Sequence, residues 1–271
     1  MIHIKKLVCV CAVCFILIPQ MYPVFGAFEY RGLGWPAAMA NIRVVGSHPF
    51  QYALNPALIE RGLPPGISLS YQKPFQGLDL QAGAISLQNR IWQRPFIHHL
   101  EFLGDELYSE LKLSSGTAWL VEKGFSAGMM WNYHHLSMSG YQSEQAISIS
   151  LSSAATIHDQ VKIGSVLENV IQLGNELTLP QKFHLGGQYI VGPVTLILSL
   201  EKESALPVEA NMGFLYASAS FWEAGFGYRD LNGELSVGWR IHLQRIAFHY
   251  VLVTHPQLPV SQGFGLEMLL P

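Results

Sequence analysis

Apolar and polar residues alternate with a period of two over most of this chain. Successive side chains of a β-strand point to opposite faces, so this alternation predicts strands with one apolar and one polar face. The clearest case is 233–243, where the apolar residues are Leu235, Val237, Trp239, Ile241 and Leu243. The segment 260–270 repeats the pattern with Phe264, Leu266, Met268 and Leu270. A chain composed almost entirely of such segments is typical of an all-β fold that closes into a barrel.

The pattern predicts thirteen strands after residue 65. They are 66–73, 77–89, 106–119, 124–136, 144–155, 159–169, 181–191, 194–203, 208–217, 219–229, 233–243, 245–254 and 260–270. Bacterial barrels usually have an even number of strands, so one further strand is expected within 91–104 or in the N-terminal segment. The expected fold is an antiparallel, up-and-down transmembrane β-barrel of 12–14 strands.

Short connections separate the predicted strands. Asn232-Gly233 is a strong hairpin signal, and Gly192-Pro193 marks another break. Strands joined by so few residues usually pair with their neighbours in sequence, which predicts a meander. The longest irregular stretches, 90–105 and 170–180, are expected to be exposed loops.

Mean hydropathy is the unusual property of the composition. Its value is +0.24, and only 13% of the residues are charged, which is a high apolar content for a secreted soluble domain. After the first residues, no apolar run approaches the roughly 20 residues of a membrane-spanning helix. A membrane protein without such helices must be a closed β-barrel, because lipid offers no hydrogen bonds to open strand edges. The apolar surplus then belongs on the outside of the barrel.

The two parities of the later strands can be assigned on this basis. Expected lipid-facing residues are Val194, Leu196, Leu198, Leu200, Trp222, Ala224, Phe226, Tyr228, Ile246, Phe248 and Tyr250. Candidate lumen-facing residues are Lys182, His184, Glu201, Glu223, Arg229 and Arg240. These charges could pair with one another in a filled lumen, or they could line a polar path. A secreted, soluble β-sandwich that binds a partner remains the alternative, since its strands also alternate.

Residues 1–26 have the features of a secretory signal peptide. Lys5 and Lys6 form the charged region, 7–18 forms the apolar region, and small residues precede the expected cleavage. An uncut membrane anchor is the alternative, but the apolar run is too short to cross a bilayer as a helix. All three cysteines lie in this leader, so the mature chain is expected to have no disulfide and no thiolate metal site. Losing both lysines leaves a mildly acidic chain without a basic patch for nucleic acid.

Residues 27–65 differ from the rest of the chain. Five prolines occur there, and no clear alternation is present. We expect a compact segment with one or two short helices, one of them at 56–60, because proline fits the first turn of a helix. An irregular surface arm is the alternative. The expected organisation is a signal peptide at 1–26, an N-terminal hatch or plug segment at 27–65 and a barrel at 66–271.

Two stretches of the sequence resemble a known group of proteins. Gly34-Trp35-Pro36-Ala37-Ala38-Met39-Ala40-Asn41, followed by Tyr52-Ala53-Leu54-Asn55-Pro56-Ala57-Leu58, is similar to the small-residue segment and Asn-Pro-Ala motif that open PorV/PorQ-like proteins and the wider FadL-type barrels. His255-Pro256-Gln257-Leu258, before the last strand, resembles the closing hairpin of the PorV/PorQ group. The chain departs from the group at Leu58 and Pro259, where glycine is usual, and in its non-aromatic end.

The resemblance implies a non-catalytic β-barrel in the bacterial outer membrane. It implies that the N-terminal segment folds into the lumen as a hatch around Asn55, Pro56 and Ala57. PorV/PorQ-type relatives act in type IX secretion and hold cargo or partner proteins at the surface, whereas FadL-type relatives pass hydrophobic small molecules. The implied function is therefore transport, or protein secretion and surface attachment. The implied partners are outer-membrane lipid, with hydrophobic small molecules or secretion-system proteins.

No pattern of chemically active residues predicts catalysis. On a strand, neighbours such as His134 and His135 point in opposite directions and cannot readily bind one metal ion together. The chain has no His-Glu-x-x-His and no phosphate loop. A trio such as Ser126, His134 and Glu144 could be imagined at a barrel rim, but nothing in its spacing selects it. We therefore expect no enzyme activity, no metal and no cofactor.

Overall fold

The structure is a computed structural model that describes residues 33–59, 64–174, 177–203, 206–218, 221–231 and 233–270. The predicted signal peptide and the first residues of the N-terminal segment lie outside these ranges. None of the helices in the described ranges is both long enough and apolar enough to cross a membrane.

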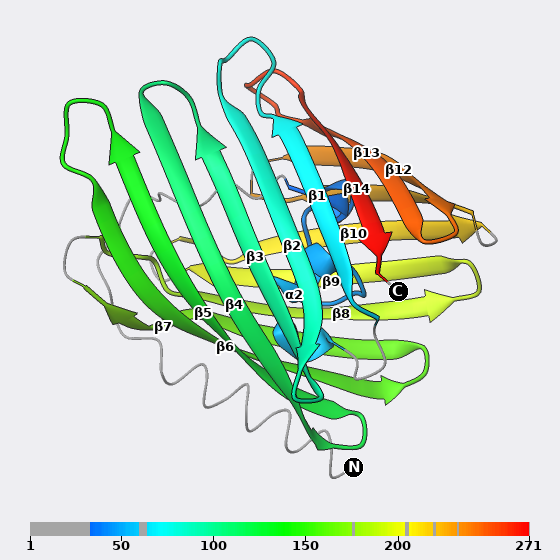
Figure 1. Ribbon diagram of the computed structural model, residues 1–271. Coiled ribbons are helices and arrows are strands. Elements are labelled where there is room, and N and C mark those ends of the chain that lie inside the picture. The colour runs from blue at the N-terminus through cyan, green and yellow to red at the C-terminus, as the bar shows by residue number, and fades with distance from the viewer. Residues whose placement is uncertain are drawn as a thin grey trace.

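Fourteen antiparallel strands form one closed barrel (Figure 1). In chain order they are β1 (Gly66–Lys73), β2 (Gln81–Ile91), β3 (Arg94–Gly104), β4 (Tyr108–Glu122), β5 (Phe125–Met138), β6 (Glu144–His158), β7 (Val161–Leu173), β8 (Lys182–Val191), β9 (Val194–Glu203), β10 (Glu209–Ser218), β11 (Trp222–Arg229), β12 (Glu234–Leu243), β13 (Ile246–Thr254) and β14 (Ser261–Leu269). Consecutive strands pair, and β14 closes the barrel on β1, with Gly66 opposite Leu269. The predicted barrel is confirmed, at the upper limit of the predicted strand number.

The further strand that was expected within 91–104 or in the N-terminal segment is β3, whereas the prediction of an exposed loop at 90–105 is wrong. Ile97 on this strand points inward and belongs to an apolar cluster with Tyr52 and Met130. His98 points to the other face, where Ser115 lies 3.1 Å from its ring nitrogen. At this one step the usual alternation is reversed, because Ile97 packs on the N-terminal segment. Farther along β3 the usual alternation holds, with His99 buried on the inner face and Leu100 and Phe102 exposed on the outer face.

The prediction of an exposed loop at 170–180 is also wrong. Strand β7 continues to Leu173, and Leu177 and Leu179 are buried in an apolar cluster with Leu136. The side-chain amide of Gln172 donates to the carbonyl oxygen of Leu179 at 2.5 Å and accepts from the amide of Leu179 at 3.0 Å. Residues 177–179 therefore pack against the strands and do not project from the barrel.

Strand connections are short at one end of the barrel and longer at the other. At the end where β1 begins, residues 92–93, 123–124 and 192–193 form two-residue turns. Trp92 and Gln93 have positive φ angles of 49° and 64°, as the mirror-image turns of tight hairpins require. Connections at the opposite end include 74–80 and 255–260. We call these the short-turn end and the long-loop end.

The outer side chains are apolar and exposed, whereas the inner ones are mainly polar and buried. Leu196, Phe226 and Trp239, on the outer face, are each 48% exposed. Ser199 and Gln188, on the inner face, are buried. All the described strands belong to one closed sheet, so no second sheet among them covers the apolar face. The alternative of a β-sandwich is therefore wrong.

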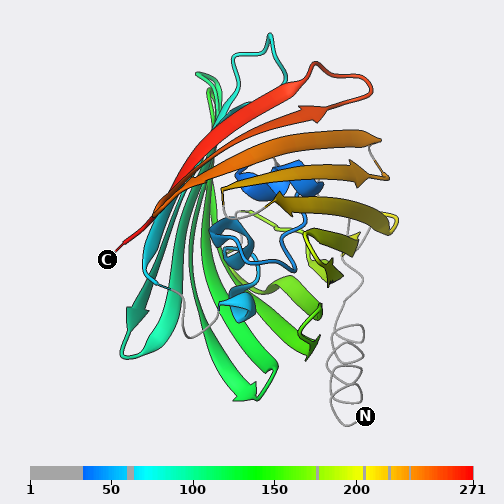
Figure 2. The same ribbon diagram turned by 90° about the vertical axis from the view of Figure 1, so that its right-hand side faces the viewer.

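Residues 33–59 lie inside the barrel, and we call them the inner segment (Figure 2). The inner segment contains three short helices, η1 (Trp35–Met39), α2 (Pro49–Tyr52) and η2 (Pro56–Leu58), and each has a proline in its first turn. Helix η1 contacts β10 to β13, while η2 contacts β4 to β6. The predicted helix at 56–60 is thus a single 3₁₀ turn that ends at Leu58.

Glycines in the wall let the backbone of the inner segment approach closely. Gly164 on β7 faces the carbonyl oxygen of Val44, and Gly227 on β11 faces the backbone nitrogen of Ala40. A Cβ atom at either glycine would overlap the facing backbone atom. A Cβ at Gly187 on β8 would instead make an ordinary contact of 3.7 Å with a carbonyl oxygen of β7. The absence of a side chain at Gly164 and Gly227 is therefore what lets the inner segment approach the wall.

Gly164→Ala should loosen the inner segment without opening the barrel, because the added methyl group displaces backbone and not a flexible side chain. We expect limited proteolysis of the folded protein to cut within 33–59 about tenfold faster, equivalent to ~1.4 kcal/mol of local opening free energy. Mass spectrometry would identify the cuts. Gly187→Ala is the matched control and should be cut at the wild-type rate. Equal rates in the two variants would contradict the proposed fit.

Candidate functional site

Different parts of the inner segment line two cavities in the lumen among the described residues. A cavity of about 620 Å³ lies at the long-loop end, and Ala37, Ala40 and Asn41 form part of its surface. A second cavity, of about 310 Å³, lies at the short-turn end between Ala57–Ile59 and the ends of β4 to β7. We call them the long-loop cavity and the short-turn cavity. The inner segment thus stands between the two ends of the lumen.

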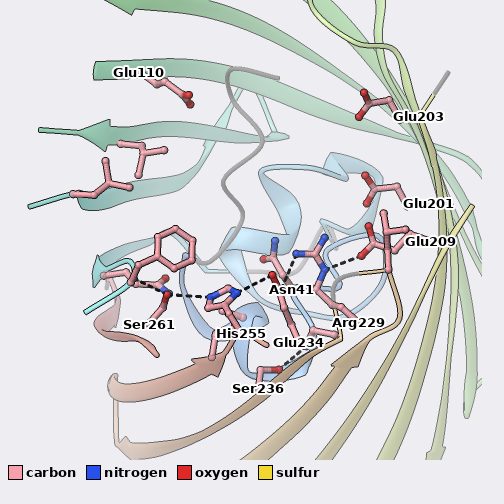
Figure 3. A pocket seen from close by; sticks show the side chains of 18 of the residues that line it. Asn41, Glu110, Glu201, Glu203, Glu209, Arg229, Glu234, Ser236, His255 and Ser261 are labelled. Atoms are coloured by element: carbon pink, nitrogen blue, oxygen red, sulfur yellow. Dashed lines mark hydrogen bonds and ion pairs between the residues drawn. The ribbon is translucent and has the colours of Figure 1, made fainter. Parts of the chain in front are cut away.

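The long-loop cavity combines apolar side chains with many charged ones (Figure 3). Its apolar lining includes Phe75, Leu80, Leu103, Leu206, Leu231 and Val253. Its carboxylates are Asp105, Glu110, Glu201, Glu203, Glu209 and Glu234, and its basic side chains are Lys182, Arg229 and His255. These charges come from strand ends next to the long loops, so barrel closure gathers them around one space.

Ion pairs organise one wall of the long-loop cavity. The ammonium group of Lys182 lies 2.9 Å from the carboxylate of Glu203. Arg229 bridges two carboxylates, at 2.7 Å from Glu209 and 3.0 Å from Glu234 (Figure 3). Such buried pairs depend on both partners, since removal of one leaves a poorly solvated charge behind.

A second charged cluster joins the inner segment to the wall. Nε2 of His48 lies 2.6 Å from the Glu267 carboxylate on β14. Arg240 lies 2.5 Å from the same carboxylate and 3.2 Å from Glu223. Because Nδ1 of His48 accepts from the amide of Phe50, neutral His48 carries its proton on Nε2 and donates it to Glu267. We call His48, Glu267 and Arg240 the latch.

Burial keeps His48 in its neutral form. Desolvation lowers the pKa of the ring to about 4, although the Glu267 carboxylate acts in the opposite direction. His48, His249 and Glu267 lie close enough together to ligate one metal ion. Two features oppose metal binding. A ligand nitrogen needs a free lone pair, but Nδ1 of His48 already accepts from Phe50 and Nε2 carries the proton. The Glu267 carboxylate is already paired with Arg240. The arrangement favours an ion-paired latch over a metal centre.

The six charged residues that the sequence assigned to the lumen fall into more than one cluster. Lys182, Glu201 and Arg229 line the long-loop cavity. Arg240 belongs to the latch and pairs with Glu223, and His184 lies between Glu168 and Glu201. The sequence analysis did not single out Glu203, although it shares the parity of Glu201. It also missed His48 and Glu267, which are 219 residues apart, because no local pattern connects them.

The Asn-Pro-Ala motif contacts β5 and β6. The side-chain amide of Asn55 donates at 2.8 Å to a carbonyl oxygen of the inner segment and at 3.2 Å to that of Ser153. Pro56 begins η2, and the carbonyl oxygen of Ala57 accepts a 2.6 Å hydrogen bond from Ser126. The three residues therefore tie one end of the inner segment to the wall.

The structure does not bring together the trio Ser126, His134 and Glu144. Ser126 and His134 both lie on β5, and the eight-residue step between them spans roughly 27 Å of an extended strand. A hydroxyl and an imidazole so far apart cannot exchange a proton directly. Ser126 instead donates a hydrogen bond to the inner segment, at the carbonyl oxygen of Ala57.

No protein-family model matches this chain, and no curated protein matches it. Solved structures share its fold. The toluene transporter TbuX of Ralstonia pickettii has a TM-score of 0.66 at 10% identity, over 90% of this chain and 100% of that one. A TodX deltaS2S3 mutant, described as a monoaromatic hydrocarbon channel, has a TM-score of 0.61 at 8% identity, over 89% of this chain and 100% of that one. Identities this low establish a common barrel fold, so function must be argued from the surface and the lumen.

Proposed function

We propose that this protein is a non-catalytic, FadL-type channel that passes small hydrophobic molecules through a bacterial outer membrane. The distribution of side chains on the closed wall carries the proposal. Large apolar residues on the outside remain highly exposed, for example 60% at Leu198 and 59% at Phe264. Lipid is the solvent that suits such a surface, and closure leaves no strand edge unpaired within it.

Features of the two barrel ends support the membrane setting. Trp92 and Phe221 at the short-turn end and Tyr141 at the long-loop end are 92%, 58% and 77% exposed. Aromatic side chains are enriched at both membrane interfaces. Short periplasmic turns and longer extracellular loops are the usual arrangement of bacterial barrels. We infer that the long-loop end faces the outside of the cell. We also infer that a signal peptide at 1–26 is cleaved before the barrel inserts.

The lumen supports a gated path for small molecules. We infer that the inner segment is the described part of a hatch at 27–65, held by Asn55, Pro56 and Ala57 and by the latch. Cavities with apolar lining lie at both ends of the lumen. The shared fold with a toluene transporter and a monoaromatic hydrocarbon channel agrees with hydrophobic cargo.

A role in type IX secretion has less support. It rests on the PorV/PorQ resemblance of the sequence, and no feature of the described residues favours a protein partner over a small molecule. The secretion role therefore stays a prediction. Location in the outer membrane without any uptake of small molecules is the result that would favour it.

Expression in a Gram-negative host should speed the entry of toluene, because the barrel offers a route through the polar lipopolysaccharide layer. We expect the initial uptake rate of radiolabelled toluene to be several-fold above that of cells with an empty vector. Heat-modifiable migration on gels would confirm folding in the membrane. Cells with an equal amount of an unrelated porin are the second control, and uptake equal to theirs would count against the proposal.

Asn55→Ala should increase the leak of polar solutes. The change removes two hydrogen bonds and leaves two buried carbonyl oxygens without that donor, at a cost of about 1–3 kcal/mol in the seating of the hatch. We expect channel openings in planar bilayers to become at least about tenfold more frequent, as ~1.4 kcal/mol would produce. Ser47→Ala, at an exposed position of the same segment, should leave the frequency unchanged. An Asn55 variant with the wild-type opening frequency would show that the motif does not hold the hatch.

Acidification should release the hatch through His48. Its pKa is about 4 in place and 6.5 is its ordinary value, so the released form binds more protons between these values. The binding of the hatch to the barrel wall therefore weakens as the pH falls from about 6.5 to about 4, and channel openings should become more frequent. Glu267, Arg240 and His249 are the charged and titratable groups that face the ring.

His48→Gln is the matched variant for this test, because glutamine can accept from Phe50 and donate to Glu267 without titrating in this range. Openings of the variant in planar bilayers should lose most of their dependence on pH between about 6.5 and 4. A full pH response in the variant would assign the effect to other groups.

A further inference from the structure

We propose that the long-loop cavity binds amphipathic organic cations and disfavours carboxylates. This inference rests on the proposed channel function and narrows its cargo. It distinguishes the protein from a channel that would capture fatty acids by their anionic head groups. Three features of the cavity carry it: an excess of carboxylates, buried amide groups that have no partner in the described part of the chain, and a partly apolar lining.

Carboxylates outnumber bases around the long-loop cavity. Six carboxylates line it, against Lys182, Arg229 and one histidine. The bases are already engaged, since Lys182 lies on Glu203, Arg229 is shared by Glu209 and Glu234, and His255 also lies 3.0 Å from Glu234. The described lining therefore has a net negative charge at neutral pH.

Burial makes this charge effective. Glu110 on β4 is 6% exposed, and Glu203 and Glu209 on the other wall are 8% and 6% exposed. Low-dielectric walls concentrate the field of such groups within the space that they enclose. A cation in the cavity would offset the field, whereas an anion would be repelled from both walls.

Buried amides provide a second, independent indication of a ligand. Gln72 on β1 lines the cavity and is only 1% exposed, yet its Nε2 donor has no hydrogen-bond partner among the described residues. Both polar side-chain atoms of Asn41, on the inner segment, are likewise without partners there. Unsatisfied buried polar groups are costly and rare in native structures. They suit a ligand that offers a hydrogen-bond acceptor as well as a positive charge.

The apolar part of the lining completes the expected chemistry. Phe75, Leu103 and Val253 stand on the same cavity as the charged groups. A volume of about 620 Å³ falls in the range of small-molecule sites, which are mostly apolar with a few placed polar groups. The cavity therefore fits an ammonium group on an aromatic or aliphatic body.

Two aromatic ions of similar size and fixed charge provide the test, benzyltrimethylammonium and benzenesulfonate. Isothermal titration of each into the folded full-length protein in detergent compares their affinities at neutral pH. We expect the cation to bind at least about tenfold more tightly, the lower limit for charged clefts that concentrate counter-ions. Equal affinities, or tighter binding of the sulfonate, would overturn the inference without the need for any variant.

Variants then locate the site. Glu110→Gln combined with Glu209→Gln removes one carboxylate from each wall and leaves Arg229 paired with Glu234. We expect this double variant to lower the preference for the cation by at least about threefold, while heat-modifiable migration shows that it folds. Glu106→Gln removes an exposed carboxylate at the same end of the barrel, outside the lining, and should have no effect. An equal loss of cation preference in the double variant and in Glu106→Gln would show that the cation binds outside the long-loop cavity.

The toluene assay keeps the two proposals separate. Toluene uptake with no preference for the cation would leave the channel function standing and refute the cation site. Preference for the cation without toluene uptake would support the site and refute hydrocarbon transport.

Discussion

Backbone hydrogen bonding between β1 and β14 is the constraint on which the rest of the structure depends. Their register runs from Gly66 opposite Leu269 to Lys73 opposite Gln262, and it leaves neither strand with an open edge. In lipid, an open edge would expose donors and acceptors that water cannot satisfy. Closure also fixes the direction of every side chain, because a shift of one residue would reverse the two faces of a strand. The apolar exterior and the charged interior both follow from it.

Closure of so many strands creates an interior that the wall cannot fill by itself. Barrels of about eight strands are just filled by their own side chains, and wider ones keep an open lumen or enclose another element. Here the enclosed element is the inner segment. Ala38 and Ala40 meet Gly225 and Gly227 of β11, where a larger wall residue would collide with them. Small residues on both sides thus bring two backbones together, and the latch adds a polar contact at another point.

The charged groups of the lumen have different roles because their surroundings differ. In the latch, Glu267 has His48 and Arg240 as close partners, so its charge is largely compensated within the protein. In the long-loop cavity the same type of carboxylate outnumbers the available bases. The first arrangement holds two parts of the chain together. The second is an excess of carboxylates in the described lining of the cavity, and this contrast underlies the proposed selectivity.

The sequence by itself determined the barrel class and most of its strands, because strand parity is a local property with a period of two. Outward residues such as Leu198 and Phe226 were identified in this way. It placed a further strand within 91–104 only as one of two options, because the inward Ile97 and the outward His98 interrupt the alternation of β3. It also could not reveal the pairing of His48 with Glu267, or the gathering of carboxylates around one cavity. Those depend on closure and on the path of the inner segment, which bring distant residues together through contacts that no short stretch of sequence encodes.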